Sequence, residues 1–133
     1  MDEQEIEALV IERGALWLAL SSLWLEREPR ESDYAAMVRE IDAMGLSLQA
    51  LERVYRLEMS PVMARYQFSM AGQWREFDEN MLLTRLVRHY RRLNGWRRTS
   101  WSLFSGLTTM MSRYRFNELV VRVMVARGER PPT

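Results

Sequence analysis

The stretch RHYRRLNGWRR, at positions 88 to 98, combines arginines with aromatic side chains and contains no acidic residue. Extended back to Thr84, it holds six arginines. Guanidinium groups bind carboxylates and phosphates through paired hydrogen bonds, and aromatic rings stack on bases or anchor a protein interface. The chemistry that this stretch predicts is therefore the binding of an anionic partner.

Three interpretations of these arginines are open. They form the solvated face of a helix and pair with acidic residues of the same chain, or they contact an acidic protein, or they bind nucleic acid. The pI of 8.2 is below the value of about 9 that is typical of a dedicated nucleic-acid-binding domain, which places nucleic acid last. The partner-binding residues that we predict are Arg85, Arg88, Arg92, Trp96, Arg97, Arg98 and, in a separate loop, Trp74.

Arg13 is a second unusual charge, because it falls on the apolar side of the predicted first helix, beside Leu9. A buried guanidinium is very costly unless it is paired with an acid. We expect a partner among Asp78, Glu79 and Glu58, and we assign the structural ion pair to Arg13 and Asp78. The alternative is an arginine that binds a ligand.

Residues that could support catalysis or metal binding are scarce. The chain has no cysteine, and its only histidine, His89, is predicted on the flank of an exposed helix. Asp78 and Glu79 are adjacent and project about 100° apart on a helix, which suits a helix N-terminus better than a catalytic carboxylate pair. No glycine-rich phosphate loop is present. We therefore predict no enzyme activity, no cofactor and no metal site.

The bulk composition is that of an ordinary globular protein. The chain has 133 residues, which suits one domain, and it is 47% hydrophobic and 28% charged. No apolar run reaches the roughly 18 residues of a membrane span, and the start, MDEQEIE, lacks the basic residues of a secretory signal. We expect a cytoplasmic protein that makes no membrane contact.

The positive charges are all arginine and are concentrated in the second half of the chain. Residues 1–60 hold 6 arginines and 13 acidic residues, a net charge of −7. Residues 61–133 hold 13 arginines and 5 acidic residues, a net charge of +8. The two halves therefore attract each other or present different faces to partners.

Helical spacing of apolar residues predicts an all-α domain of about six helices over residues 1–127, followed by a disordered tail at 128–133. The first helix is expected to end near Arg27. In the next part of the chain, Gly45 suits the end of a second helix and Ser47 the N-cap of a third. Pro61 predicts a break after that third helix, since proline cannot continue a regular helical hydrogen-bond ladder.

The second half is predicted to contain a helix over residues 79–93 whose arginines face water. A loop follows at 96–100, and the next helix has Leu103, Phe104, Leu107 and Met111 on its core side. Residues 116–127 are rich in β-branched side chains, so both helix and strand are open. We prefer helix there, because a lone strand would have no pairing partner.

The predicted first helix carries apolar residues on two sides. Ile11, Leu18 and Leu25 form a stripe roughly opposite the main apolar face. A helix with two apolar sides is either central to a bundle or supplies a surface to a partner, which includes a second copy in a homodimer.

The stretches LWLALSSLWLE (16–26), SLQALERVYRLEMSPV (47–62) and SMAGQWREFDE (69–79) occur in this order. Together they resemble an uncharacterised family of small bacterial all-α proteins, catalogued only as a domain of unknown function. The resemblance covers about residues 13–84, although Ser22 stands where members commonly have aspartate. It implies that the arginine-rich helix lies beyond the shared scaffold.

From these observations we expect a small cytoplasmic bacterial protein that acts by binding another protein. An immunity or inhibitor protein that neutralises a toxin with an acidic surface is the most specific form of this prediction. The alternative is a nucleic-acid-associated regulator that uses the arginine-rich face at residues 85–98.

Overall fold

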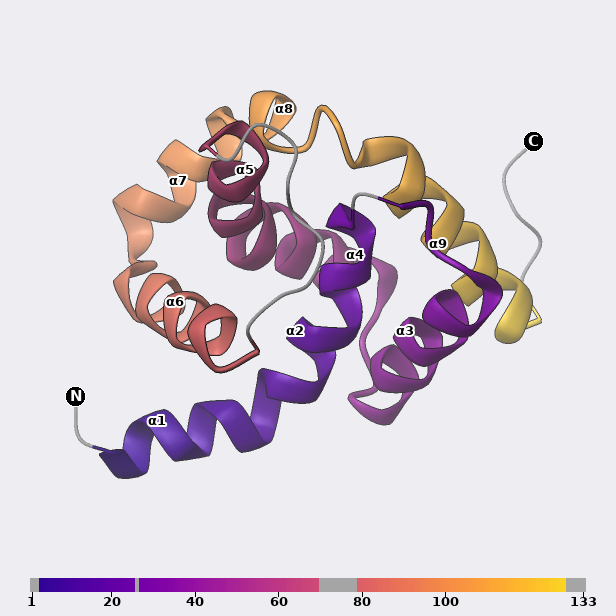
Figure 1. The fold of residues 1–133 in the computed structure, drawn as a ribbon, viewed down its shortest axis with the longest axis horizontal. Coiled ribbons are helices and arrows are strands. Elements are labelled where there is room, and N and C mark those ends of the chain that lie inside the picture. Colours follow the sequence, from indigo (N-terminus) through magenta and orange to yellow (C-terminus); the bar gives the residue numbers. More distant parts are fainter. Residues whose placement is uncertain (1–2, 26, 70–78, 129–133) are drawn as a thin grey trace.

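The computed structural model describes residues 3–25, 27–69 and 79–128, and the regular elements in these ranges are all helical (Figure 1). Several consecutive segments continue into one another, so that the described residues form seven helices. The predicted all-α bundle of about six helices is confirmed. Of the predicted tail at 128–133, residues 129–133 lie outside the described residues.

The N-terminal helix is built from four consecutive segments. They are α1 (Glu3–Leu9), the π-helical turn η1 (Val10–Gly14), α2 (Ala15–Leu20) and the 3-10 turn η2 (Ser21–Trp24). The helix ends at Trp24, earlier than predicted. Arg115 accounts for this end, because its Nη1 donates to the carbonyl oxygens of Leu23 and Leu25 at 3.2 and 2.7 Å.

Helix α3 (Glu31–Ala43) and helix α4 (Leu48–Arg53) have the end signals that the sequence predicts. Gly45 adopts a φ of 63°, and the N–H of Leu46 donates to the carbonyl of Ile41 at 3.2 Å. The Ser47 hydroxyl accepts the N–H of Ala50 at 3.0 Å. Both predicted signals are confirmed.

The predicted break before Pro61 is wrong. Helix α4 continues through the π-helical turn η3 (Val54–Met59) into α5 (Ser60–Ser69). The wider π turn lets Ser60 satisfy the carbonyl of Tyr55, to which its hydroxyl donates at 2.6 Å. The carbonyl of Leu57, which would accept the N–H that Pro61 lacks, receives a hydrogen bond from His89 at 2.7 Å.

The remaining helices are α6 (Glu79–Arg92), α7 (Gly95–Leu103), α8 (Ser105–Thr108) and α9 (Arg113–Ala126). The predicted loop at 96–100 is wrong, because Asn94 caps α7: its side-chain oxygen accepts the N–H of Arg97 at 3.2 Å. Residues 116–126 belong to α9, which confirms helix over strand. Gly128, with a φ of 75°, follows the end of α9.

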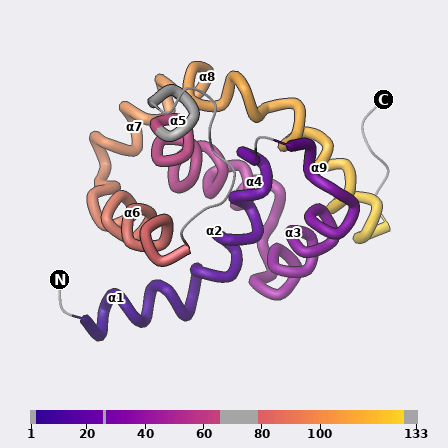
Figure 2. Tube along the Cα trace, in the orientation of Figure 1, coloured from indigo at the N-terminus to yellow at the C-terminus, as the bar shows by residue number. Residues whose placement is uncertain are grey.

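Helix α2, in the second half of the N-terminal helix, lies between two groups of helices, whereas α1 extends outward on the side of α6 (Figures 1 and 2). Helices α3 and α9 pack together on one side, and α5, α6, α7 and α8 lie on the other. Large aromatic side chains fill the centre: Tyr55 stacks on Phe116 with 3.9 Å between ring centroids, and Trp24 lies 5.6 Å from Tyr55. Within the described ranges, no helix has the length and apolar character to cross a membrane.

Candidate functional site

The arginines of α9, and Arg127 directly after it, are paired with acidic residues from the first half of the chain. These pairs tie α9 to α3, α4 and the segment before α3. We considered ion pairs with acidic residues of the same chain for the arginines of residues 84–98. In the structure, the arginines of residues 113–127 make such pairs. The pairs are Arg113 with Glu52, Arg115 with Glu28, Arg122 with Glu31, and Arg127 with Asp42.

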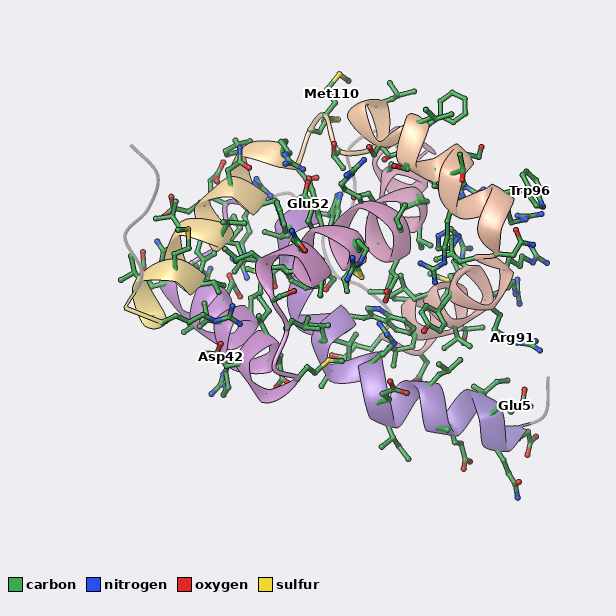
Figure 3. All side chains as sticks on the ribbon, turned by 180° about the vertical axis from the view of Figure 1, so that it is seen from behind. Glu5, Asp42, Glu52, Arg91, Trp96 and Met110 are labelled. Carbon is green, nitrogen blue, oxygen red and sulfur yellow. The ribbon has the colours of Figure 1, made fainter. Side chains whose placement is uncertain are left out.

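The arginines of α6 and α7 lie at the opposite end of the molecule. Figure 3 shows Arg91 and Trp96 pointing outward at this end, far from Asp42 beside α9. Between Glu79 and Glu118 the sequence contains no acidic residue. In the part of the chain that the structure describes, no carboxylate forms an ion pair with Arg88, Arg92 or Arg97. The charges of these three arginines are therefore not neutralised by an ion pair within the described residues.

A pocket of about 250 Å³ lies between α5, α6 and α7. It brings together four of the predicted residues from two helices with five residues that were not predicted to belong to the site, three of them large polar or aromatic side chains. Arg65 comes from α5, His89 from α6 and Trp101 from α7. Its lining residues are Pro61, Val62, Arg65, Arg85, Arg88, His89, Arg92, Arg97 and Trp101.

His89 lies on the flank of α6, and its half-buried side chain lines this pocket. Because a carbonyl can only accept, the Nε2 that contacts Leu57 carries the proton. Burial lowers the pKa of His89, and the neighbouring charges of Arg65 and Arg97 lower it further. The His89 ring meets the Trp101 ring edge-on at 5.8 Å. Pro61, which deprives Leu57 of its donor, is the signal that could have placed His89 here.

The other predicted contact residues lie outside the pocket. Arg98 lines a separate hollow, together with Glu5 and Leu9 of the N-terminal helix. The Trp96 side chain is 67% exposed, and the guanidinium of Arg97 lies 5.1 Å from its ring centroid. Trp74 lies outside the described residues. The predicted set is therefore divided between a pocket and its surroundings.

An apolar ridge lies next to the arginines, along the end of α7, α8 and the turn that follows. We predicted most of these side chains in the core, and this prediction is wrong, because each is more than half exposed. Figure 3 shows Met110 projecting outward. The apolar ridge consists of Leu103, Phe104, Leu107, Met110 and Met111.

Hydrogen bonds to the buried serines of residues 103–112 explain why the apolar side chains of this segment face solvent. Ser105 and Ser112 are buried against the body of the protein. The Ser105 hydroxyl accepts from Arg56 Nε at 3.1 Å, and the Ser112 hydroxyl lies 2.7 Å from the Tyr55 hydroxyl. Because the polar side faces inward, the apolar side faces water. Exposed apolar groups of this kind mark interaction surfaces.

Arg13 pairs with Glu58, one of the three acids that we considered. Its Nη1 lies 2.8 and 3.0 Å from the two carboxylate oxygens, and Trp17 Nε1 donates to the same carboxylate at 3.1 Å. The guanidinium also lies 4.7 Å from the ring centroid of Tyr90. The assignment to Asp78 is replaced by Glu58, and Asp78 lies outside the described residues. This network joins the N-terminal helix to η3 and α6.

The predicted apolar stripe does not form one exposed surface. Its members are Ile11, Leu18 and Leu25, and they differ in burial. Ile11 is 83% exposed, whereas Leu18 packs against the core and Leu25 is half-buried. In the ranges 3–25, 27–69 and 79–128, no group of three His, Asp or Glu residues is placed to hold a metal ion.

Comparison with known proteins gives one match. A family model described as "Domain of unknown function (DUF7079)" matches residues 11–122. This range includes α6, α7, the apolar ridge and most of α9, so the expectation that the arginine-rich helix lies outside the shared scaffold is wrong. No curated protein and no solved structure matches the chain.

Proposed function

The chain belongs to the family described as Domain of unknown function (DUF7079), and from this premise we propose that it acts by binding another protein. The binding surface is the apolar ridge together with the arginines of α6 and α7. The observation that supports this proposal most is the inverted segment 103–112, whose apolar side chains face water while its serines are buried. A domain of this size gains stability from burying such side chains, so their exposure indicates a role in contact.

The positive charge of the arginines on α6 and α7 indicates which kind of protein would bind to this surface. Arg88 and Arg92 on α6 and Arg97 on α7 have no carboxylate partner among the described residues. A partner with both acidic and apolar groups would satisfy the arginines and cover the apolar ridge. Exposed Trp96 lies among these arginines, next to Arg97, and is suited to anchor the contact.

The most specific form of the proposal is a cytoplasmic immunity or inhibitor protein that neutralises a toxin. It is a binding role and requires no catalytic group, cofactor or metal. The alternative partner is nucleic acid, bound by the same arginines through phosphate contacts. A second copy of the chain is a further alternative, which Ile11 would serve, and a monomeric mass in solution would count against it.

The test is co-purification with the product of the neighbouring gene, expressed from the same plasmid. Retention of that product by the wild-type chain is expected, as is its loss in the ridge variant L103S/L107S and in R88Q/R92Q/R97Q. The control R39Q/R53Q, which removes two positive charges rather than three, changes exposed arginines on α3 and α4 and should retain the partner. Retention that survives both surface variants would refute the proposal, and loss of bound nucleic acid alone in the arginine variant would favour the alternative.

A further inference from the structure

We propose that the pocket between α5, α6 and α7 is a binding site for a single phosphate group. Positively charged side chains converge on this pocket. Guanidinium groups reach the pocket from three helices: Arg65 from α5, Arg88 and Arg92 from α6, and Arg97 from α7. Among the described residues, no carboxylate lines this pocket. Like charges gathered in this way repel each other, and a bound anion removes the repulsion.

The chemistry of arginine favours phosphate over other anions. A guanidinium presents its donors in a planar fork that matches two oxygens of one oxyanion. A carboxylate offers two oxygens and one negative charge, which one arginine can satisfy. A phosphate monoester has three acceptor oxygens and a charge of about −1.5 to −2 at pH 7, so it can be shared by several arginines.

The size and walls of the pocket fit a small group. A volume of about 250 Å³ is below the roughly 300–1,000 Å³ of pockets for drug-sized ligands. Pro61, Val62 and Trp101 provide apolar walls on two sides. Such walls reduce the screening of charge by water and strengthen each arginine contact.

His89 fixes the base of the site and also reports on it. Its Nε2 is held by the Leu57 carbonyl, so the ring is oriented by the protein and lies among the pocket arginines in their positively charged field. Phosphate in the pocket would offset much of that positive field, which favours protonation of the ring. Because His89 is the only histidine in the chain, its imidazole signals in an NMR spectrum are unambiguous.

The experiment is a titration of the full chain with inorganic phosphate, followed through the His89 signals at constant ionic strength with chloride as the balancing ion. A saturable shift and a higher pKa of His89 are expected. In R88Q/R92Q the affinity should fall by about tenfold or more, since two charge-assisted contacts are lost. The matched control R39Q/R53Q has the same net charge and should stay within about twofold, because both arginines lie outside the pocket.

Two results would overturn the proposal: no saturable His89 response to phosphate, or an equal loss of affinity in the pocket and control variants. If R88Q/R92Q does not fold, the single variants R88Q and R92Q, compared with R39Q, decide in the same way. The ridge variant L103S/L107S should bind phosphate as the wild type does. A failure of the protein-binding proposal and a failure of this one are therefore distinguishable.

Further binding measurements identify the source of the phosphate group. A phosphoserine peptide that binds more tightly than inorganic phosphate, while its unphosphorylated form does not bind, assigns the group to a modified protein partner. Equal affinity for the phosphopeptide and inorganic phosphate assigns it to a free small molecule. Binding of an oligonucleotide that R88Q/R92Q does not weaken would show that nucleic acid uses other residues.

Discussion

The Nε2 atom of His89 lies 2.7 Å from the carbonyl oxygen of Leu57. Pro61, four residues after Leu57, has no N–H to give to that oxygen, so a side chain of α6 supplies the missing donor. The same hydrogen bond fixes α6 against the end of η3. It also holds the wall of the arginine pocket in place. The missing N–H of Pro61 therefore affects both the hydrogen bonding of this helix and the shape of the candidate site.

Replacement of His89 by alanine should lower the free energy of unfolding by about 1–2 kcal/mol, because the Leu57 carbonyl loses its donor. Urea denaturation measures this change. Pro61→Ala supplies the control, since it restores a backbone N–H that can serve the carbonyl. In that background His89→Ala should cost clearly less, and an equal cost in both backgrounds would contradict the assignment.

The stability of the protein should depend on pH through His89. Its pKa in the folded state is below the ordinary value of 6.5. Above that pH both states carry a neutral ring, whereas below it the unfolded chain takes up the proton first and stability falls until the lower folded pKa is passed. His89→Gln should remove this loss in denaturant titrations between neutral and mildly acidic pH. The loss from paired carboxylates such as Asp33, whose pKa is lowered mainly by Arg27, occurs at lower pH.

Helix ends were predictable from the sequence where the signal is local. Gly45 ends α3 with a positive φ, and Ser47 caps α4, because each role depends only on residues within one turn. The pair Asn94–Gly95 also carries a local signal, but this signal fits two roles. Such a pair ends one helix or begins the next, and here Asn94 caps α7.

The candidate site was less predictable, because it depends on contacts between distant segments. Apolar spacing at Leu103 and Leu107 is that of a core helix, and only the partners of the intervening polar residues decide which side faces inward. Those partners, Tyr55 and Arg56, lie in η3. The choice of Glu58 for Arg13 likewise required the packing of η3 against the N-terminal helix.

Replacement of Glu58 by alanine should destabilise the protein by about 3 kcal/mol, since it leaves both the Arg13 guanidinium and the Trp17 indole N–H without their acceptor. Thermal and urea unfolding measure the loss. The conservative change Glu58→Gln keeps an oxygen for Trp17 and should cost less. The double variant Arg13→Met/Glu58→Met should cost less than the sum of the single changes, and strict additivity would contradict a direct pair.

Alkaline pH should destabilise the fold through Tyr55. Burial raises the pKa of its phenol from 10.0 to about 12. Its contribution is complete below pH 10 and is lost as the pH rises toward 12, because the unfolded chain ionises first; the loss is on the order of 2 kcal/mol. Tyr55→Phe should lack this part of the alkaline loss in denaturant titrations. A wild type and variant with parallel profiles above pH 10 would contradict it.

The inverted segment gives a matched pair of substitutions with opposite expectations. Ser112→Ala removes a buried hydroxyl that lies 2.7 Å from the Tyr55 hydroxyl, so it should lower the free energy of unfolding by about 1–2 kcal/mol. Leu107→Gln replaces a leucine that is 60% exposed with a good helix former and should change stability by less than about 0.5 kcal/mol. The ordinary order, in which loss of a leucine costs more than loss of a serine hydroxyl, would mean that α8 faces the core. The expected order means that Leu107 faces solvent, as the proposed contact with a partner requires.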